Sequence, residues 1–160
     1  MKEQILYTYT ELKEFVRESN LIEGIDRTPS EDEIDELRRF LLLKHVCVHD
    51  LVKFVSIYQP NARLRDEFGM NVRVGKYYPP SGNPDMPIRL GKILQSGLDA
   101  FTLHVEYEKL HPFTDGNGRS GRALWAWKHK DISMKFLHPF YYQSLSYFNF
   151  RGWREYNEVD

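Results

Sequence analysis

The sequence lacks most of the features that mark secreted, membrane-spanning or nucleic-acid-binding proteins. It contains a single cysteine, Cys47, and this scarcity suits a reducing cytoplasm as the expected compartment. No apolar run approaches the length of a membrane span, and the N-terminus shows no targeting segment. The formal net charge is only −1, with lysine and arginine spread along the chain. We therefore expect neither nucleic acid nor an anionic membrane as a partner.

Length and apolar spacing predict a single all-α domain over residues 1–160. The chain is long enough to bury one core, and it contains no internal repeat, low-complexity tract or domain linker. Thr10, Ser30 and Asp99 are predicted helix N-caps. Apolar residues recur at helical spacing in segments that indicate six or more helices: 10–22, 30–46, 48–58, 87–98, 100–110 and 118–130.

One segment departs from helical spacing. Residues 71–80 alternate in the manner of a short strand or hairpin over Val72–Tyr78, before Pro79 and Pro80 turn the chain away. The sequence therefore predicts one small β-hairpin in an otherwise helical domain.

The densest chemistry lies in the twelve residues His111-Pro112-Phe113-Thr114-Asp115-Gly116-Asn117-Gly118-Arg119-Ser120-Gly121-Arg122. Gly116 and Gly118 can adopt positive φ angles and turn consecutive backbone N–H groups toward one point, which forms a nest for an anion. The helix that follows adds its free N–H groups and the positive end of its dipole. Arg119 and Arg122 lie three residues apart on one helix face, and each can donate two hydrogen bonds to phosphate oxygens. This stretch is therefore predicted to bind the phosphates of a nucleotide.

His111 and Asp115 supply the groups that a transfer reaction requires. The ordinary histidine pKa of about 6.5 lets a neutral imidazole accept a proton from an attacking hydroxyl near pH 7. Asp115 stands directly before the glycines, where its carboxylate can hold Mg²⁺ against the same phosphates. Phe113 is interpreted as an anchor of the loop in the core. A base, a metal ligand, an anion nest and a pair of guanidiniums together favour a nucleotidyl transferase.

The same stretch resembles, position for position, the motif His-Pro-Phe-x-(Asp/Glu)-Gly-Asn-(Gly/Lys)-Arg-x-x-Arg of the Fic family. The resemblance covers about residues 40–150 in arrangement and 104–122 in detail. It implies transfer of AMP from ATP, the co-substrate, to a Ser, Thr or Tyr hydroxyl of a target protein. It also implies that the hairpin at 71–80 is a flap on which the target docks, and it leaves a homo-oligomer open. The implied site consists of the base His111, the Mg²⁺ ligand Asp115, the anion hole Gly116, Asn117 and Gly118, and the β- and γ-phosphate contacts Arg119 and Arg122.

A second resemblance lies near the N-terminus. Ser19-Asn20-Leu21-Ile22-Glu23-Gly24 is similar to the inhibitory motif (Ser/Thr)-x-x-x-Glu-(Gly/Asn) of autoinhibited Fic proteins, which implies an inhibitory helix at 10–24 with Ser19 and Glu23 as regulatory residues. The Glu23 carboxylate can pair with Arg122 and take the place of a γ-phosphate. The alternative is an exposed glutamate followed by a glycine that ends the helix.

Other functions compete with AMP transfer. Doc-like kinases have similar loops but carry lysine where this chain has Gly118, so this position favours nucleotidyl over phosphoryl transfer. Transfer of another moiety or hydrolytic removal of AMP would use the same metal and anion sites. A non-catalytic module of the same fold is a further alternative, although the intact motif is typical of an enzyme.

Three further groups of residues were considered for function. His104 is interpreted as a packed, hydrogen-bonded support of the loop. His45, Cys47 and His49 invite a metal interpretation, but no fourth ligand is evident, so packed histidines and a buried thiol are expected. The aromatic residues of 136–153 are expected to pack in the core, and some of them to line an adenine pocket.

Overall fold

The computed structural model describes residues 6–133, and within them the chain is all-α, as predicted. The described part contains six helices and no strand, consistent with a Fic-type helical domain. The helices are α1 (Tyr9–Ile22), α2 (Glu31–Leu41), α3 (Val48–Tyr58), α4 (Met86–Gln95), α5 (Ala100–Leu110) and α6 (Asn117–His129). The single-domain organisation over all 160 residues stays a prediction.

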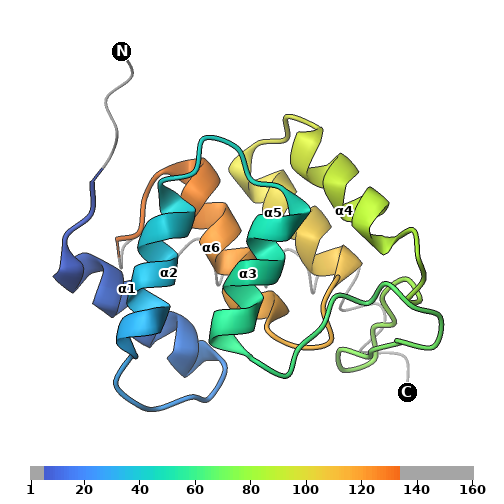
Figure 1. Ribbon diagram of the computed structural model, residues 1–160, viewed down its shortest axis with the longest axis horizontal. Coiled ribbons are helices and arrows are strands. Elements are labelled where there is room, and N and C mark those ends of the chain that lie inside the picture. The colour runs from blue at the N-terminus through green and yellow to red at the C-terminus, as the bar shows by residue number, and fades with distance from the viewer. Residues whose placement is uncertain (1–5, 134–160) are drawn as a thin grey trace.

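α6 is the central helix of the bundle (Figure 1). It packs against α5, α2, α3 and α1, while α4 packs on the outer side against α5 and α3. Ala123, Leu124 and Ala126 of α6 are fully buried, and small side chains at two of these positions let neighbouring helices approach closely. α6 therefore fixes the loop that precedes it relative to four other helices.

The helix N-caps confirm two sequence predictions and correct one. Ser30 and Asp99 cap α2 and α5 as expected, since each side chain accepts a hydrogen bond from the backbone N–H three residues on. Thr10, however, is not the cap of α1. Thr8 is, because its hydroxyl accepts from the Glu11 N–H at 3.1 Å while the Glu11 carboxylate accepts from the Thr8 N–H at 3.0 Å. This reciprocal capping box sets the N-cap at Thr8, earlier than the cap at Thr10 that apolar spacing suggests.

Two helices are shorter than predicted. α2 ends at Leu41 and not near residue 46, and α4 spans Met86–Gln95 and not 87–98. Gly97, with φ of +68°, ends α4, because a left-handed residue breaks the helical path. Ile88, an expected core residue, is 58 % exposed, since the face of α4 that carries Met86 and Leu90 is the buried one.

The predicted hairpin is reduced to a tight turn within an irregular loop over residues 59–85. Val74 and Tyr77 exchange two backbone hydrogen bonds of 2.9 Å each, and no strand extends from this pair. Pro79–Pro80 lacks backbone N–H groups, so the ladder has no donors with which to continue. The flap candidate at 71–80 is therefore a two-residue β-turn on a loop.

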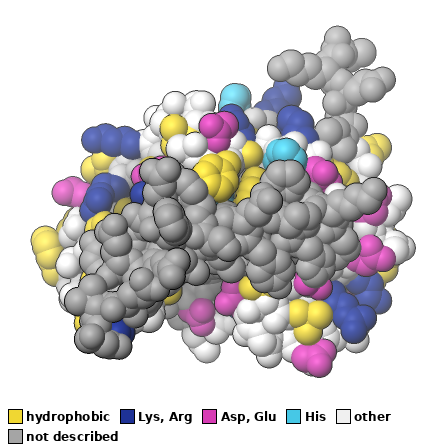
Figure 2. Space-filling model, turned by 180° about the vertical axis from the view of Figure 1, so that it is seen from behind, with side chains coloured by type: hydrophobic (Ala, Val, Ile, Leu, Met, Phe, Trp, Pro, Cys, Tyr) yellow, Lys and Arg dark blue, Asp and Glu magenta, His cyan; other side chains and the backbone are white. Residues whose placement is uncertain are grey.

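Surface features agree with the low net charge. On the face shown in Figure 2, acidic and basic side chains of the described residues are interspersed. No helix between residues 6 and 133 has the length and apolar character that a membrane crossing requires. The aromatic segment 136–153 lies outside the described residues, so its predicted core and adenine-pocket roles stay predictions.

Candidate active site

The twelve-residue stretch forms the connection from α5 to α6 and the first turns of α6. His111 follows α5 in the left-handed conformation, with φ of 50° and ψ of 61°, and Gly116 precedes α6 with φ of +79°. Between these two turning points the side chain of Asn117 closes the loop. Its Oδ1 accepts from the Phe113 N–H at 2.9 Å and its Nδ2 donates to the Phe113 carbonyl at 2.8 Å. Phe113 is 1 % exposed and anchors the loop in the core, as expected.

At the N-terminus of α6, the groups left to bind an anion are backbone N–H groups, because the Asn117 side chain is already bonded to Phe113. The N–H groups of residues 117–119 have no acceptor within the helix, because they belong to its first turn. The Gly116 N–H is already used, since it donates to Asp115 Oδ1 at 2.7 Å. Of the two glycines in the predicted nest, only Gly116 has a positive φ, because Gly118 lies within α6. The groups left for an anion are main-chain N–H groups at a helix start, where the dipole also favours negative charge.

The His111 imidazole is kept neutral by its surroundings. Burial lowers its pKa to about 4, and the positive charge of Arg65 acts in the same direction. A hydrogen bond with the Glu108 backbone and the charges of Glu23 and Asp115 act against both. The imidazole is therefore in the form that accepts a proton near pH 7.

Sequence spacing did not single out Arg65, which joins the loop after α3 to the loop between α5 and α6, the candidate catalytic loop (residues 111–116). Its guanidinium is fully buried and donates to the carbonyls of Leu110 (2.9 Å), His111 (2.8 Å), Met70 (3.2 Å) and Pro80 (2.8 Å). The backbone of Arg65 adds an N–H to the Pro112 carbonyl at 2.9 Å. All these acceptors are neutral carbonyl groups, so no carboxylate among them balances the positive charge of the guanidinium beside His111. The bond to the His111 carbonyl also holds this residue in its left-handed conformation.

Arg122, the second arginine of the motif, is bound by α1. Its Nε donates to Ser19 Oγ at 2.8 Å, and its Nη2 donates to the Ser19 carbonyl at 2.9 Å and to Glu23 Oε1 at 2.7 Å. Arg122 is 1 % exposed, whereas the Glu23 side chain is 39 % exposed. The two regulatory candidates, Ser19 and Glu23, therefore occupy one guanidinium together, 99 residues or more away in sequence.

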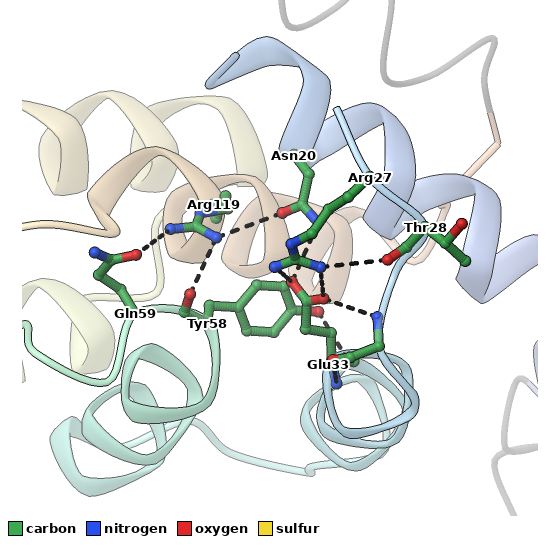
Figure 3. A network of polar contacts seen from close by, with 8 residues as sticks. Asn20, Arg27, Thr28, Glu33, Tyr58, Gln59 and Arg119 are labelled. Atoms are coloured by element: carbon green, nitrogen blue, oxygen red, sulfur yellow. Dashed lines mark hydrogen bonds and ion pairs between the residues drawn. The ribbon is translucent and has the colours of Figure 1, made fainter. Parts of the chain in front are cut away.

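Arg119, the first arginine, is held by a different set of groups (Figure 3). It donates to the Tyr58 carbonyl at 3.1 Å, to Gln59 Oε1 at 3.1 Å and, at 3.5 Å, to Asn20 Oδ1. Its Nε is buried without a partner among the described residues. Three of its five N–H groups are thus taken by α1 and by the end of α3, and the Nε–H is enclosed without a partner within residues 6–133.

Asn20 connects this arginine to a buried acid on α2 (Figure 3). Its Nδ2 donates to Glu33 Oε2 at 3.1 Å, and Arg27 donates to Glu33 Oε1 at 2.6 Å. Burial alone would raise the pKa of Glu33, but hydrogen bonds from Arg27, Ser30 and Asn20 lower it to about 2. The C-terminal end of α1, which carries Ser19, Asn20 and the adjoining Glu23, is therefore bound to α2 as well as to α6.

Two glycines of α6 leave room for two carboxylates. A Cβ at Gly118 would overlap Glu23 Oε1, and a Cβ at Gly121 would overlap Glu108 Oε1. Glu108 was not a sequence candidate, and its Oε1 is buried without a partner among the described residues. Burial raises its pKa to about 8, the charge of Glu23 adds to the rise, and Arg122 opposes it. Glycine inside a helix often marks the close approach of another group. The glycines at 118 and 121 were therefore the sequence signal that could have indicated these two neighbours.

Asp115 is exposed at the end of the loop, directly before the first turn of α6. Residues 6–133 contain no group of three or more His, Cys, Asp or Glu side chains that could hold a metal ion. Mg²⁺ commonly binds through one or two carboxylates together with substrate phosphates, so a single exposed aspartate beside main-chain donors and two arginines fits this ion.

The remaining sequence candidates are His104 and the group of His45, Cys47 and His49. His104 is buried, its Nδ1 lies 3.1 Å from the Gly121 carbonyl, and its ring lies 4.7 Å from the ring of Trp125, so the predicted supporting role is consistent with its contacts. His45, Cys47 and His49 are all exposed. The expectation of packed histidines and a buried thiol was wrong, because α2 ends before these residues and leaves them on the connection to α3 and its first turn.

Comparison with curated proteins gave no match, and comparison with solved structures gave none either. A comparison with protein families did give one. Residues 90–127, which include most of α4, all of α5, the catalytic loop and nearly all of α6, match the model of the Fic/DOC family.

Proposed function

We propose that the chain is a Fic-type protein adenylyltransferase that transfers AMP from ATP to a Ser, Thr or Tyr hydroxyl of a target protein. The observation that carries the proposal is the loop after α5, where a neutral imidazole precedes an open helix N-terminus and the Arg122 guanidinium lies beside Gly118 in the first turn of that helix. Phosphoryl and nucleotidyl transfer depend mainly on positioning and on compensation of negative charge, which these groups supply.

In the proposed reaction, the target hydroxyl attacks the α-phosphate of ATP and its proton passes to His111. A bond forms between the hydroxyl oxygen and the α-phosphorus, and the bond between the α-phosphorus and the bridging oxygen breaks to release pyrophosphate. The N–H groups of residues 117–119, Arg119 and Arg122 stabilise the phosphates. Asp115 would hold Mg²⁺, which neutralises phosphate charge when bound.

The proposal includes autoinhibition by Glu23. The Glu23 carboxylate occupies Nη2 of Arg122 at 2.7 Å, a donor that the terminal phosphate of ATP would otherwise take. A charge-assisted hydrogen bond of this kind contributes about 1.5–3 kcal/mol, which corresponds to roughly a 10- to 150-fold change in the population of the open state. ATP would bind productively only after α1 releases the arginine.

Mass spectrometry after incubation with ATP and Mg²⁺ tests the proposal. We expect the Glu23→Gly protein to gain the mass of AMP on itself, while the wild-type protein and the Glu23→Gly/His111→Ala protein do not. Glu14→Gly removes an exposed glutamate from the same helix and serves as the matched control. A gain of one phosphate would support a Doc-like kinase instead. No transfer from labelled ATP to any protein of a cell lysate would support a non-catalytic module.

A further inference from the structure

A cavity of about 400 Å³ lies beside the turn at residues 74–77, between α4 and α5. Tyr77 borders it from the turn, Arg89 and Lys92 from α4, and Lys109 and Leu110 from α5. Its volume is in the range of ligand-binding clefts. None of the residues of the catalytic loop lines it, although Leu110 immediately precedes His111.

The charges around the cavity are unbalanced. Among the described residues that line it, Arg89, Lys92 and Lys109 contribute three cations and Glu106 one carboxylate. Glu106 already faces Lys109 at 4.0 Å, whereas Arg89 and Lys92 have no ion-pair partner among residues 6–133. The buried guanidinium of Arg65 adds a further charge nearby, because Arg89 contributes to lowering its pKa after the larger effect of burial. The cavity therefore attracts a negatively charged group.

The surface around the cavity is also apolar. Ile93 and Leu110 contribute to its lining, and two of the most exposed large apolar side chains lie on the bordering elements: Tyr78 is 67 % exposed and Ile88 is 58 % exposed. Exposed apolar side chains next to cations are typical of protein-binding surfaces rather than of sites for free inorganic anions. The features match a peptide segment that carries acidic and apolar side chains together.

The cavity is mechanically connected to the catalytic loop. The Tyr77 hydroxyl donates to the Lys109 carbonyl at 2.7 Å, which fixes the turn to the last turn of α5. Arg65 donates to both the Pro80 and the His111 carbonyls, so the wall of the cavity and the proposed base share one anchor. Leu110 lines the cavity and directly precedes His111, so the cavity borders the backbone that carries the proposed base.

We propose that this cavity docks an acidic segment of the target protein, in which Asp or Glu side chains pair with Arg89 and Lys92 while neighbouring apolar side chains contact Tyr78 and Ile88. This proposal rests on the proposed function, because it names the chemical class of the protein that presents the hydroxyl. It places the specificity for the target on α4 and the turn, outside the nucleotide site.

Fluorescence anisotropy with labelled peptides tests the docking without any catalysis. The first probe is a twelve-residue peptide of alternating Glu and Leu with one central Tyr, and the second has Lys in place of every Glu. We expect the wild-type protein to bind the acidic peptide only, more tightly at low salt, and the Arg89→Gln/Lys92→Gln protein to bind it about three- to tenfold more weakly. Arg38→Gln/Lys53→Gln removes an exposed Arg and an exposed Lys from α2 and α3 and should leave binding unchanged. Equal effects of the two double variants, or displacement of the peptide by inorganic phosphate at the same ionic strength, would overturn the proposal.

A transfer assay separates the two proposals. With ATP and Mg²⁺, we expect the Glu23→Gly protein to add AMP to the central Tyr of the acidic peptide faster than to that of the basic peptide, and Arg89→Gln/Lys92→Gln in the same background to lose this preference while it still modifies itself. Self-modification without any preference between the peptides would refute the docking site alone. Selective binding of the acidic peptide with no AMP transfer to any protein would refute the adenylyltransferase and leave the docking site standing.

Discussion

Replacing Glu108 by glutamine should stabilise the protein at neutral pH, because the folded chain keeps this carboxyl protonated in a buried position. The pKa of Glu108 is raised by burial from 4.5 to about 8. Between these values the folded state binds a proton that the unfolded state has lost, so the free energy of unfolding falls as the pH rises. The contribution is fully present below pH 4.5 and is lost by pH 8. At 1.36 kcal/mol per pH unit, the loss between pH 5 and pH 7 reaches at most about 2.5 kcal/mol.

Urea unfolding of the wild-type and Glu108→Gln proteins at pH 5, 6 and 7 measures this quantity. Both proteins share every other titrating group, so the difference between their free energies of unfolding isolates Glu108. We expect this difference to grow in favour of the variant by up to about 2.5 kcal/mol from pH 5 to pH 7. Glu106→Gln, at a half-exposed position of the same helix, is the matched control and should leave the difference from the wild type unchanged between pH 5 and pH 7. Parallel curves for Glu108→Gln as well would show that Glu108 is ionised in the folded protein and would refute the reasoning.

Three other substitutions test the site. Arg65→Lys keeps the charge but loses the fork that reaches four carbonyls, and should lower the free energy of unfolding in urea by at least about 2 kcal/mol. His104→Gln should make the free energy of unfolding less dependent on pH. Burial lowers the pKa of His104 from 6.5 to about 4, so protonation of this histidine in the unfolded state costs the wild type about 2 kcal/mol of stability between pH 7 and pH 5. An equal loss of stability in the variant over this range would contradict the prediction. In the Glu23→Gly background, Asp115→Asn should raise the Mg²⁺ concentration required for half-maximal transfer at least about tenfold, and an unchanged Mg²⁺ titration would exclude Asp115 as the ligand.

Local patterns in the sequence were sufficient for most of the fold. α3 and α5 have the predicted bounds, because the apolar spacing in each is unbroken and strong stop signals follow. The hydrogen bonds that shape the catalytic loop are also local, since Asn117 bonds to a residue only four positions away. The cap that was missed, Thr8, depends on side-chain hydrogen bonds, to which apolar spacing is insensitive. The end of α2 at Leu41 was missed because the apolar pattern continues past it, through Leu42, Leu43 and Val46.

The site residues that the sequence predicted are those of the two motifs, in residues 19–24 and 111–122. Glu23 lies against Arg122 at 2.7 Å, in the pairing that the sequence suggested, while its inhibitory role stays a proposal. Arg65, Glu108 and Asn20 were not predicted, because their importance comes from partners 45 to 99 residues away or from burial, and single residues carry no periodic signal of such contacts. The contact between α1 and α6 was predicted from the resemblance of residues 19–24 to the inhibitory motif, and apolar spacing alone would not have predicted it.

The glycine at position 118 has a consequence for how the loop can vary. Any side chain there would overlap the Glu23 carboxylate, which is the flexible end of a half-exposed residue and would move off Arg122 rather than force the helices apart. A lysine at this position, as in Doc-like loops, and a glutamate on α1 paired with Arg122 are therefore sterically incompatible. A side chain added at 118 would thus separate Glu23 from Arg122 in one step and abolish the autoinhibition proposed above, without any change to α1 itself.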